Sequence, residues 1–234
     1  MNTKTSCAVL VIFAIFTMLM ACSTNETAHN YNWSIAVTDD AELFSPIPKS
    51  EEEELIWNAL FPFWGFEKSF GPEEILKNFD ISRWIETTFS VLKNNGLSEK
   101  YKSKINNEFF YIVPFEVFEN YFTKIFPYIE FEESAKSTAY YFADLQAICC
   151  PVESMSYFQF PAVGGTFISD VKEINNQIII TACMVFPNSL PDGEITKEKI
   201  YSSCNYSEAT LVVEFSDLGW KYISYDYKLV ENDY

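Results

Sequence analysis

Apolar residues recur at the spacing of one helix face in two segments of the chain. The first segment runs from about residue 81 to 94 and ends at Asn95-Gly96, and the second runs from about residue 115 to 126 and ends before Pro127. Each pattern predicts an amphipathic helix with one buried face. The residues on these faces are Ile81, Trp84, Ile85, Thr88, Phe89 and Leu92 in the first segment, and Phe118, Tyr121, Phe122 and Ile125 in the second.

Another helix is predicted by a start signal at Ser50. Four glutamates, Glu51 to Glu54, follow this serine, and a serine with a glutamate three residues later is a capping-box pattern. Because acidic side chains are favoured at the positive end of a helix dipole, we interpret the four glutamates as a helix start and not as a metal site. We expect this helix to end before Pro62, and Pro72-Glu73-Glu74 is a candidate start for a further helical turn.

From about Ser137 the pattern becomes that of extended strands. Asn175-Asn176 separates two apolar segments and is a plausible two-residue hairpin turn. In residues 220–230, Ile223, Tyr225, Tyr227 and Leu229 alternate with polar residues, as in a half-buried strand. The predicted extended segments are residues 139–149, 155–160, 166–174, 177–186, 200–215 and 220–230.

This order of elements predicts an α+β fold, in which N-terminal helices pack on a C-terminal antiparallel sheet built as a meander of hairpins. The order also resembles, in architecture alone, the cone-shaped folds of the nuclear-transport-factor-2-like kind. That resemblance implies a curved, cone-like sheet.

The N-terminal segment has the pattern of a secretory signal. Lys4 precedes an apolar run from Ala8 to Met20, which a small residue, Ala21, closes. The residues Leu19-Met20-Ala21-Cys22 resemble the lipobox of bacterial lipoproteins. This resemblance implies cleavage before Cys22 and lipidation of its thiol, which would anchor the protein to the extracytoplasmic side of the cell membrane.

Two other readings of the N-terminus stay open: an uncleaved membrane anchor, and an ordinary signal peptide cut nearby. The apolar run is shorter than the roughly 20 residues of a spanning helix, so we favour the lipoprotein signal. The expected organisation is therefore a signal peptide at 1–21, a lipidated tether and extended linker at 22–49, and a single α+β domain at 50–234.

The charge of the chain excludes one class of partner. The formal net charge is −17, and loss of residues 1–21, which contain Lys4 as their only charged residue, makes it −18. An acidic surface repels phosphate backbones, so we expect no nucleic-acid partner and contact with the membrane through the lipid on Cys22.

Residues suited to catalysis or metal binding are scarce in the sequence. The one histidine, His29, lies in the predicted tether, where nothing would hold it against a nucleophile. No zinc-ligand spacing or phosphate-binding loop is present, so we predict no catalytic residue, metal ligand or cofactor. Carboxylates remain, and a glycosidase needs only two of them about 5 to 10 Å apart, a spacing that sequence cannot identify.

Four cysteines follow Cys22: Cys149, Cys150, Cys183 and Cys204. Cys183 and Cys204 lie nearly symmetrically about Gly193, the centre of an expected hairpin loop, so a disulfide between them is a candidate. The alternative, that all four are buried thiols, stays open.

These observations favour a membrane-anchored module that binds a small molecule or an envelope protein and is not a catalyst. The alternative is a cell-envelope glycan hydrolase that uses paired carboxylates.

Overall fold

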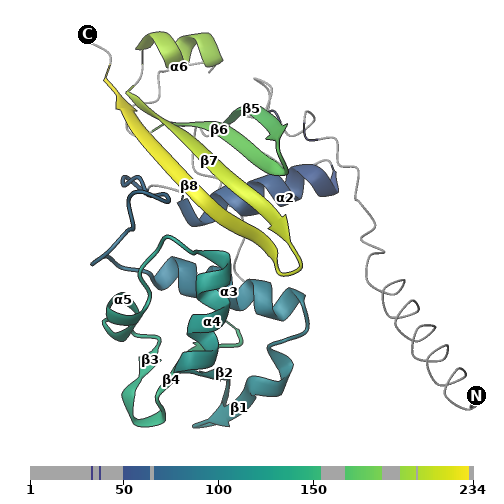
Figure 1. Cartoon of the computed structure of the whole chain (residues 1–234), viewed down its shortest axis with the longest axis vertical. Coiled ribbons are helices and arrows are strands. Elements are labelled where there is room, and N and C mark those ends of the chain that lie inside the picture. Colours follow the sequence, from purple (N-terminus) through teal and green to yellow (C-terminus); the bar gives the residue numbers. More distant parts are fainter. Residues whose placement is uncertain are drawn as a thin grey trace, which may run out of the picture. The chain divides into compact units, whose positions relative to one another are not determined.

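The computed structural model describes Trp33, Val37, Ser50 and residues 51–63, 66–153, 167–185, 196–203 and 205–231. These residues form two four-stranded antiparallel sheets together with helices, which confirms the predicted α+β class (Figure 1). The helices are α2 (Glu51–Leu60), α3 (Ser82–Asn94), α4 (Phe115–Ile125), α5 (Glu132–Lys136) and α6 (Lys197–Ser203), with short 3-10 turns η3 (Phe61–Phe63), η4 (Glu99–Tyr101) and η5 (Ala143–Leu145). The strands are β1 (Lys102–Ile105), β2 (Glu108–Pro114), β3 (Tyr141–Phe142), β4 (Ala147–Pro151), β5 (Phe167–Ile174), β6 (Gln177–Val185), β7 (Tyr206–Ser216) and β8 (Gly219–Val230).

The C-terminal sheet is the predicted meander, with strand order β5-β6-β7-β8. The predicted turn at Asn175-Asn176 joins β5 to β6, and both residues have positive φ, 53° and 64°. Asparagine tolerates this conformation better than most residues, and it is the one that a two-residue hairpin turn of the right twist requires. The predicted segment 155–160 lies outside the described residues.

A bulge in β8 changes which side chains of that strand are buried. Val212 pairs with Ser224 and Val213 with Tyr222, so Ile223 is an extra residue on β8. Because one extra residue reverses the alternation, Trp220 and Tyr222 are buried together with Tyr225. The predicted alternation from Ile223 holds at Tyr225 but is wrong at Leu229, which was expected to be buried and is 44% exposed.

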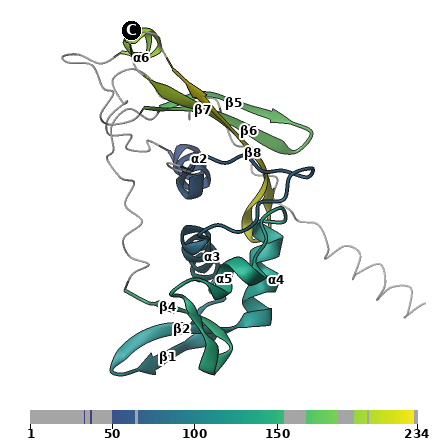
Figure 2. The ribbon, with the colours of Figure 1, turned by 90° about the vertical axis from the view of Figure 1, so that its left-hand side faces the viewer.

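Helices lie on both faces of the C-terminal sheet. Helix α2 packs on one face (Figure 2). There Phe63 of the following turn contacts Tyr222 and Tyr225. Helix α6 covers the other face near one end, where its Ile200 is buried with Phe167, Cys183, Val185 and Tyr206. The prediction of a strand from residue 200 is thus wrong for residues 200–203, which belong to α6, and β7 begins at Tyr206.

The predicted helix boundaries agree with the structure. The side-chain oxygen of Ser50 accepts a hydrogen bond from the Glu53 amide at 3.2 Å and caps α2. The predicted face of α3 is buried throughout, and Gly96 after its end has φ of +66°. Residues Pro72-Glu73-Glu74 do not begin a helix, because Gly71 and Glu74 exchange backbone hydrogen bonds as a tight turn.

The other sheet, with order β1-β2-β4-β3, was not predicted as a sheet. Its edge strand β1 has the sequence Lys-Ser-Lys-Ile and is largely exposed, so it carries no alternation of apolar and polar residues that would reveal it. Strand β4 supplies the buried residues Ala147 to Cys150, and β2 pairs with it.

The core between the C-terminal sheet and α3 is built from aromatic rings around Phe63. This ring is fully buried and lies 4.7 Å from the ring of Tyr225, 5.3 Å from that of Tyr222 and 6.0 Å from that of Trp84, between centroids. Phe70 adds a backbone link, because it exchanges two hydrogen bonds with Tyr225 on β8. These contacts fix α2 and α3 next to the β7–β8 hairpin.

Candidate functional site

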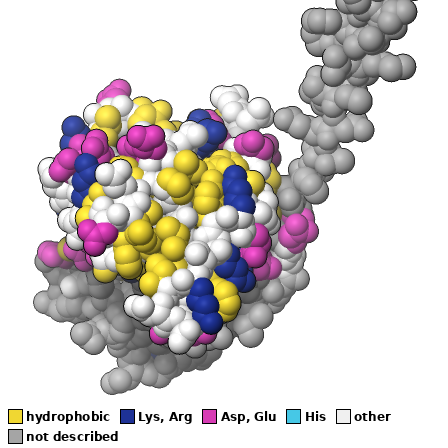
Figure 3. All heavy atoms as spheres, turned by 90° about the horizontal axis from the view of Figure 1, so that it is seen from below, with side chains coloured by type: hydrophobic (Ala, Val, Ile, Leu, Met, Phe, Trp, Pro, Cys, Tyr) yellow, Lys and Arg dark blue, Asp and Glu magenta, His cyan; other side chains and the backbone are white. Residues whose placement is uncertain are grey.

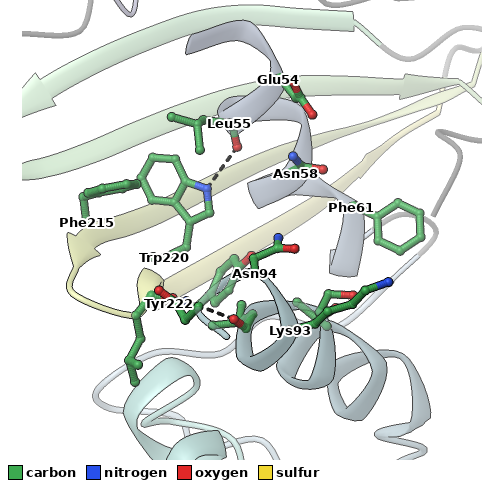
Figure 4. A pocket seen from close by; sticks show the side chains of 15 residues that line it. Glu54, Leu55, Asn58, Phe61, Lys93, Asn94, Phe215, Trp220 and Tyr222 are labelled. Carbon is green, nitrogen blue, oxygen red and sulfur yellow. Dashed lines mark hydrogen bonds between the residues drawn. The ribbon is translucent and has the colours of Figure 1, made fainter. Parts of the chain in front are cut away.

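A groove of about 410 Å³ lies between α2, α3 and the hairpin that joins β7 to β8 (Figure 4). This volume is within the range of small-molecule sites. Its lining residues are Glu54, Leu55, Asn58 and Phe61 from α2 and η3; Thr87, Ser90, Val91, Lys93, Asn94 and Asn95 from α3 and its end; and Phe215, Leu218, Gly219, Trp220 and Tyr222 from the hairpin.

Trp220 holds the apolar side of the groove in place. Its indole Nε1 donates a hydrogen bond to the Leu55 carbonyl oxygen at 3.0 Å, which ties β8 to α2. Phe215 is its partner across the strands, and the two rings meet edge to face with centroids 5.0 Å apart. Trp33 packs on the same indole, with ring centroids 5.9 Å apart. The indole is only 6% exposed, whereas the Phe215 ring is 44% exposed at the groove's edge.

The tip of the hairpin is docked on the end of α3. Ser216 Oγ accepts a hydrogen bond from the Leu218 amide and donates one to the Gly219 carbonyl, and Gly219 has φ of +99°, which favours glycine. The Asn95 side chain donates to the carbonyl oxygens of Val91 at 2.9 Å and Leu218 at 3.4 Å. The two walls of the groove are therefore joined at this end.

Polar side chains of the groove come from α2 and α3. Figure 4 shows Asn58 of α2 and Asn94 of α3 on facing sides of the groove. Asn58 and Asn94 are exposed and Ser90 is partly buried; their side chains make no hydrogen bond within the described part of the chain. Such groups can exchange water for a ligand without breaking an internal bond.

A paired-carboxylate mechanism needs two acids, and the described residues that line the groove supply one of them. This carboxylate is that of Glu54, and the one base among the described lining residues is Lys93 on α3. Outside the groove, the pKa of Glu214 is lowered by hydrogen bonds from Lys221 at 2.8 Å and Gln177 at 3.0 Å. A general acid needs a raised pKa, so Glu214 is suited to a structural ion pair.

Burial raises the pKa of several tyrosines in the core. Tyr222 and Tyr225, in the core beside the groove, are affected in this way. Near β4, burial raises the pKa of Tyr140, and its hydroxyl donates to Glu86, which raises the pKa further. These groups stay protonated at neutral pH and act as hydrogen-bond donors or core residues.

On the side of the sheet formed by β1 to β4, the surface combines lysines with exposed hydrophobic side chains (Figure 3). The Nζ atoms of Lys102 and Lys104 each lie 5.7 Å from the ring centroid of Phe109, which is 52% exposed. Lysines on an edge strand discourage pairing with another sheet, and this role accounts for their position on β1.

Of the residues predicted for lipidation or a disulfide, the structure describes Cys183, which does not line the groove. Cys22 and His29 lie outside the described residues, as does Cys204. Cys183 is buried on β6, and the residue opposite it on β7 is Glu208. The symmetric placement of Cys183 and Cys204 about Gly193 therefore does not correspond to the pairing of the strands. The disulfide stays a prediction, which mass spectrometry of unreduced peptides can test.

Among the described residues, no group of histidine, cysteine and acidic side chains could hold a metal ion, and no helix is long and apolar enough to cross a bilayer. Comparison with protein-family models, characterised proteins and solved structures finds no match to this chain.

Proposed function

We propose that the chain is a lipid-anchored, extracytoplasmic binding protein and that the groove between α2, α3 and the β7–β8 hairpin is its ligand site. The lipobox-like residues Leu19-Met20-Ala21-Cys22 support the anchor and its location. The observation that carries the binding function is the pair of amides, Asn58 and Asn94, on facing walls beside an aromatic side. Ligand sites commonly combine apolar and aromatic side chains with polar groups that fix the orientation of the ligand.

Lipid labelling of cells tests the anchor. The parent protein should incorporate labelled palmitate and shift in size when the signal is removed, whereas a Cys22→Ser variant should do neither. Equal labelling of both proteins would contradict the anchor.

Thermal unfolding tests the groove, with full-length protein in a detergent that contains no sugar. The panel holds neutral oligosaccharides, acidic oligosaccharides, amino acids, short peptides and nucleosides. A ligand that binds only the folded state raises the melting temperature. We expect at least one class to do so for the parent and for Asn120→Trp, a control on the exposed part of α4, but not for Ser90→Trp, which fills the groove. The absence of any shift, or equal shifts in both variants, would contradict the proposal.

A further inference from the structure

We propose that the groove binds a neutral oligosaccharide and does not cleave it. This inference rests on the proposed function, because it names the ligand class of the same groove.

The charge of the groove selects a neutral ligand. The described residues that line it include one acid, Glu54, and one base, Lys93, so their formal charges cancel in a chain whose net charge is −17. A polyanionic ligand would meet no excess of basic side chains among these residues and would be repelled by the net negative charge of the chain. A cationic ligand would find one carboxylate, that of Glu54, among the described residues that line the groove.

The hydrogen-bonding groups of the groove match hydroxyl groups. Asparagine offers a donor and an acceptor on one planar amide, and serine offers both on one oxygen. A sugar hydroxyl likewise donates and accepts, so Asn58, Ser90 and Asn94 can each bond to it in either sense. All three come from helices whose position is fixed by the Trp220–Leu55 hydrogen bond and the aromatic core.

The apolar side of the groove matches the C–H face of a sugar ring. The exposed ring of Phe215 lies at the edge, against the buried indole of Trp220. An aromatic ring has a large, rigid apolar surface, and it covers the C–H face while neighbouring amides bond to the hydroxyls.

A peptide is less well matched than a sugar. Extended peptides commonly bind by adding a strand to an unpaired sheet edge. β8 is an edge strand of its sheet, but Phe70 already exchanges two backbone hydrogen bonds with Tyr225 on it, so part of this edge is occupied by the chain itself. Cleavage of a bound glycan is not expected, because hydrolysis requires two carboxylates and Glu54 is the one that lines the groove among the described residues.

Isothermal titration calorimetry of the full-length protein in sugar-free detergent tests the inference. The ligands are cellohexaose, maltohexaose, xylohexaose and chitohexaose, with hexagalacturonic acid as the anionic analogue and hexa-alanine as the peptide. We expect one or more of the neutral sugars to bind, and the acidic hexamer to bind at least tenfold more weakly. Asn58→Ala and Asn94→Ala should each weaken sugar binding about three- to tenfold, as loss of a neutral hydrogen bond predicts.

A matched control variant distinguishes an effect in the groove from an effect elsewhere in the chain. Asn120→Ala removes the same amide from an exposed helical position outside the groove and should leave the affinity unchanged. The sugar should be recovered intact after incubation with the parent protein.

Several results of these titrations would contradict the inference. Binding of the acidic hexamer as tightly as the neutral ones would reject the charge argument, and equal losses in Asn58→Ala and Asn120→Ala would reject the site. Binding of hexa-alanine or another class without sugar binding would reject the ligand class while leaving the proposed function intact. Failure of all four sugars would reject the neutral-oligosaccharide proposal.

Discussion

Replacing Phe63 with alanine tests the packing that holds α2 against the C-terminal sheet. The Phe63 ring is fully buried, and its centroid lies 4.7 to 6.4 Å from those of five other rings. The rings are those of Phe66, Phe70, Trp84, Tyr222 and Tyr225.

The expected cost follows from this environment. A buried Phe→Ala change destabilises a protein by about 3 to 5 kcal/mol, and rigid aromatic neighbours leave little room for the cavity to collapse. We therefore expect Phe63→Ala to lower the free energy of unfolding by about 4 kcal/mol. With a urea m value of about 2 kcal/mol/M, the midpoint should fall by about 2 M.

Urea unfolding followed by tryptophan fluorescence measures this loss, with Phe109→Ala as the matched control. Phe109 is 52% exposed on β2, so the same truncation there should cost about 1 kcal/mol or less. A loss below about 2 kcal/mol for Phe63→Ala, or equal losses for the two variants, would refute the central position of this ring.

Three further predictions concern single side chains. Asn176→Val should lower stability by about 1 to 2 kcal/mol, because valine is strained at φ of 64°, while Asn176→Gly should cost little; urea unfolding of both variants checks this. Burial raises the pKa of the Cys149 thiol to about 11, so alkylation at pH 8, located by mass spectrometry, should be slow in the native protein and fast in urea. Lys221 lowers the pKa of Glu214 in the folded state, so the stability from this pair is present above about pH 4.3 and is lost as the pH falls through the lowered pKa. Lys221→Met should therefore lower the melting temperature at pH 7 but not at pH 3, and equal losses at both pH values would contradict the pairing.

Local signals in the sequence predicted the elements whose ends depend on one or two residues. Ser50 caps α2 through its own side chain, and Asn175-Asn176 adopts the positive φ values that the hairpin needs. Gly96 ends α3 for the same conformational reason. These features are set by neighbours in the chain, so the sequence displays them.

Features that depend on distant packing were missed. Residues 197–203 form α6, and its Ile200 completes a buried cluster on the sheet, whereas a strand was predicted from residue 200. The bulge at Ile223 and the polar edge strand β1 carry no periodic signal. The groove was missed for the same reason, because Asn58, Asn94 and Trp220 meet only after α2, α3 and β8 have packed together.

The most direct test of the groove as the ligand site is a two-dimensional NMR titration of ¹⁵N-labelled protein with the tightest-binding neutral oligosaccharide. The side-chain amide signals of Asn58 and Asn94 and the indole N–H signal of Trp220 should shift with the bound fraction, while the side-chain amide of Asn120 should stay in place. Saturating ligand that leaves these three groove signals unmoved would contradict the assignment of the groove as the binding site.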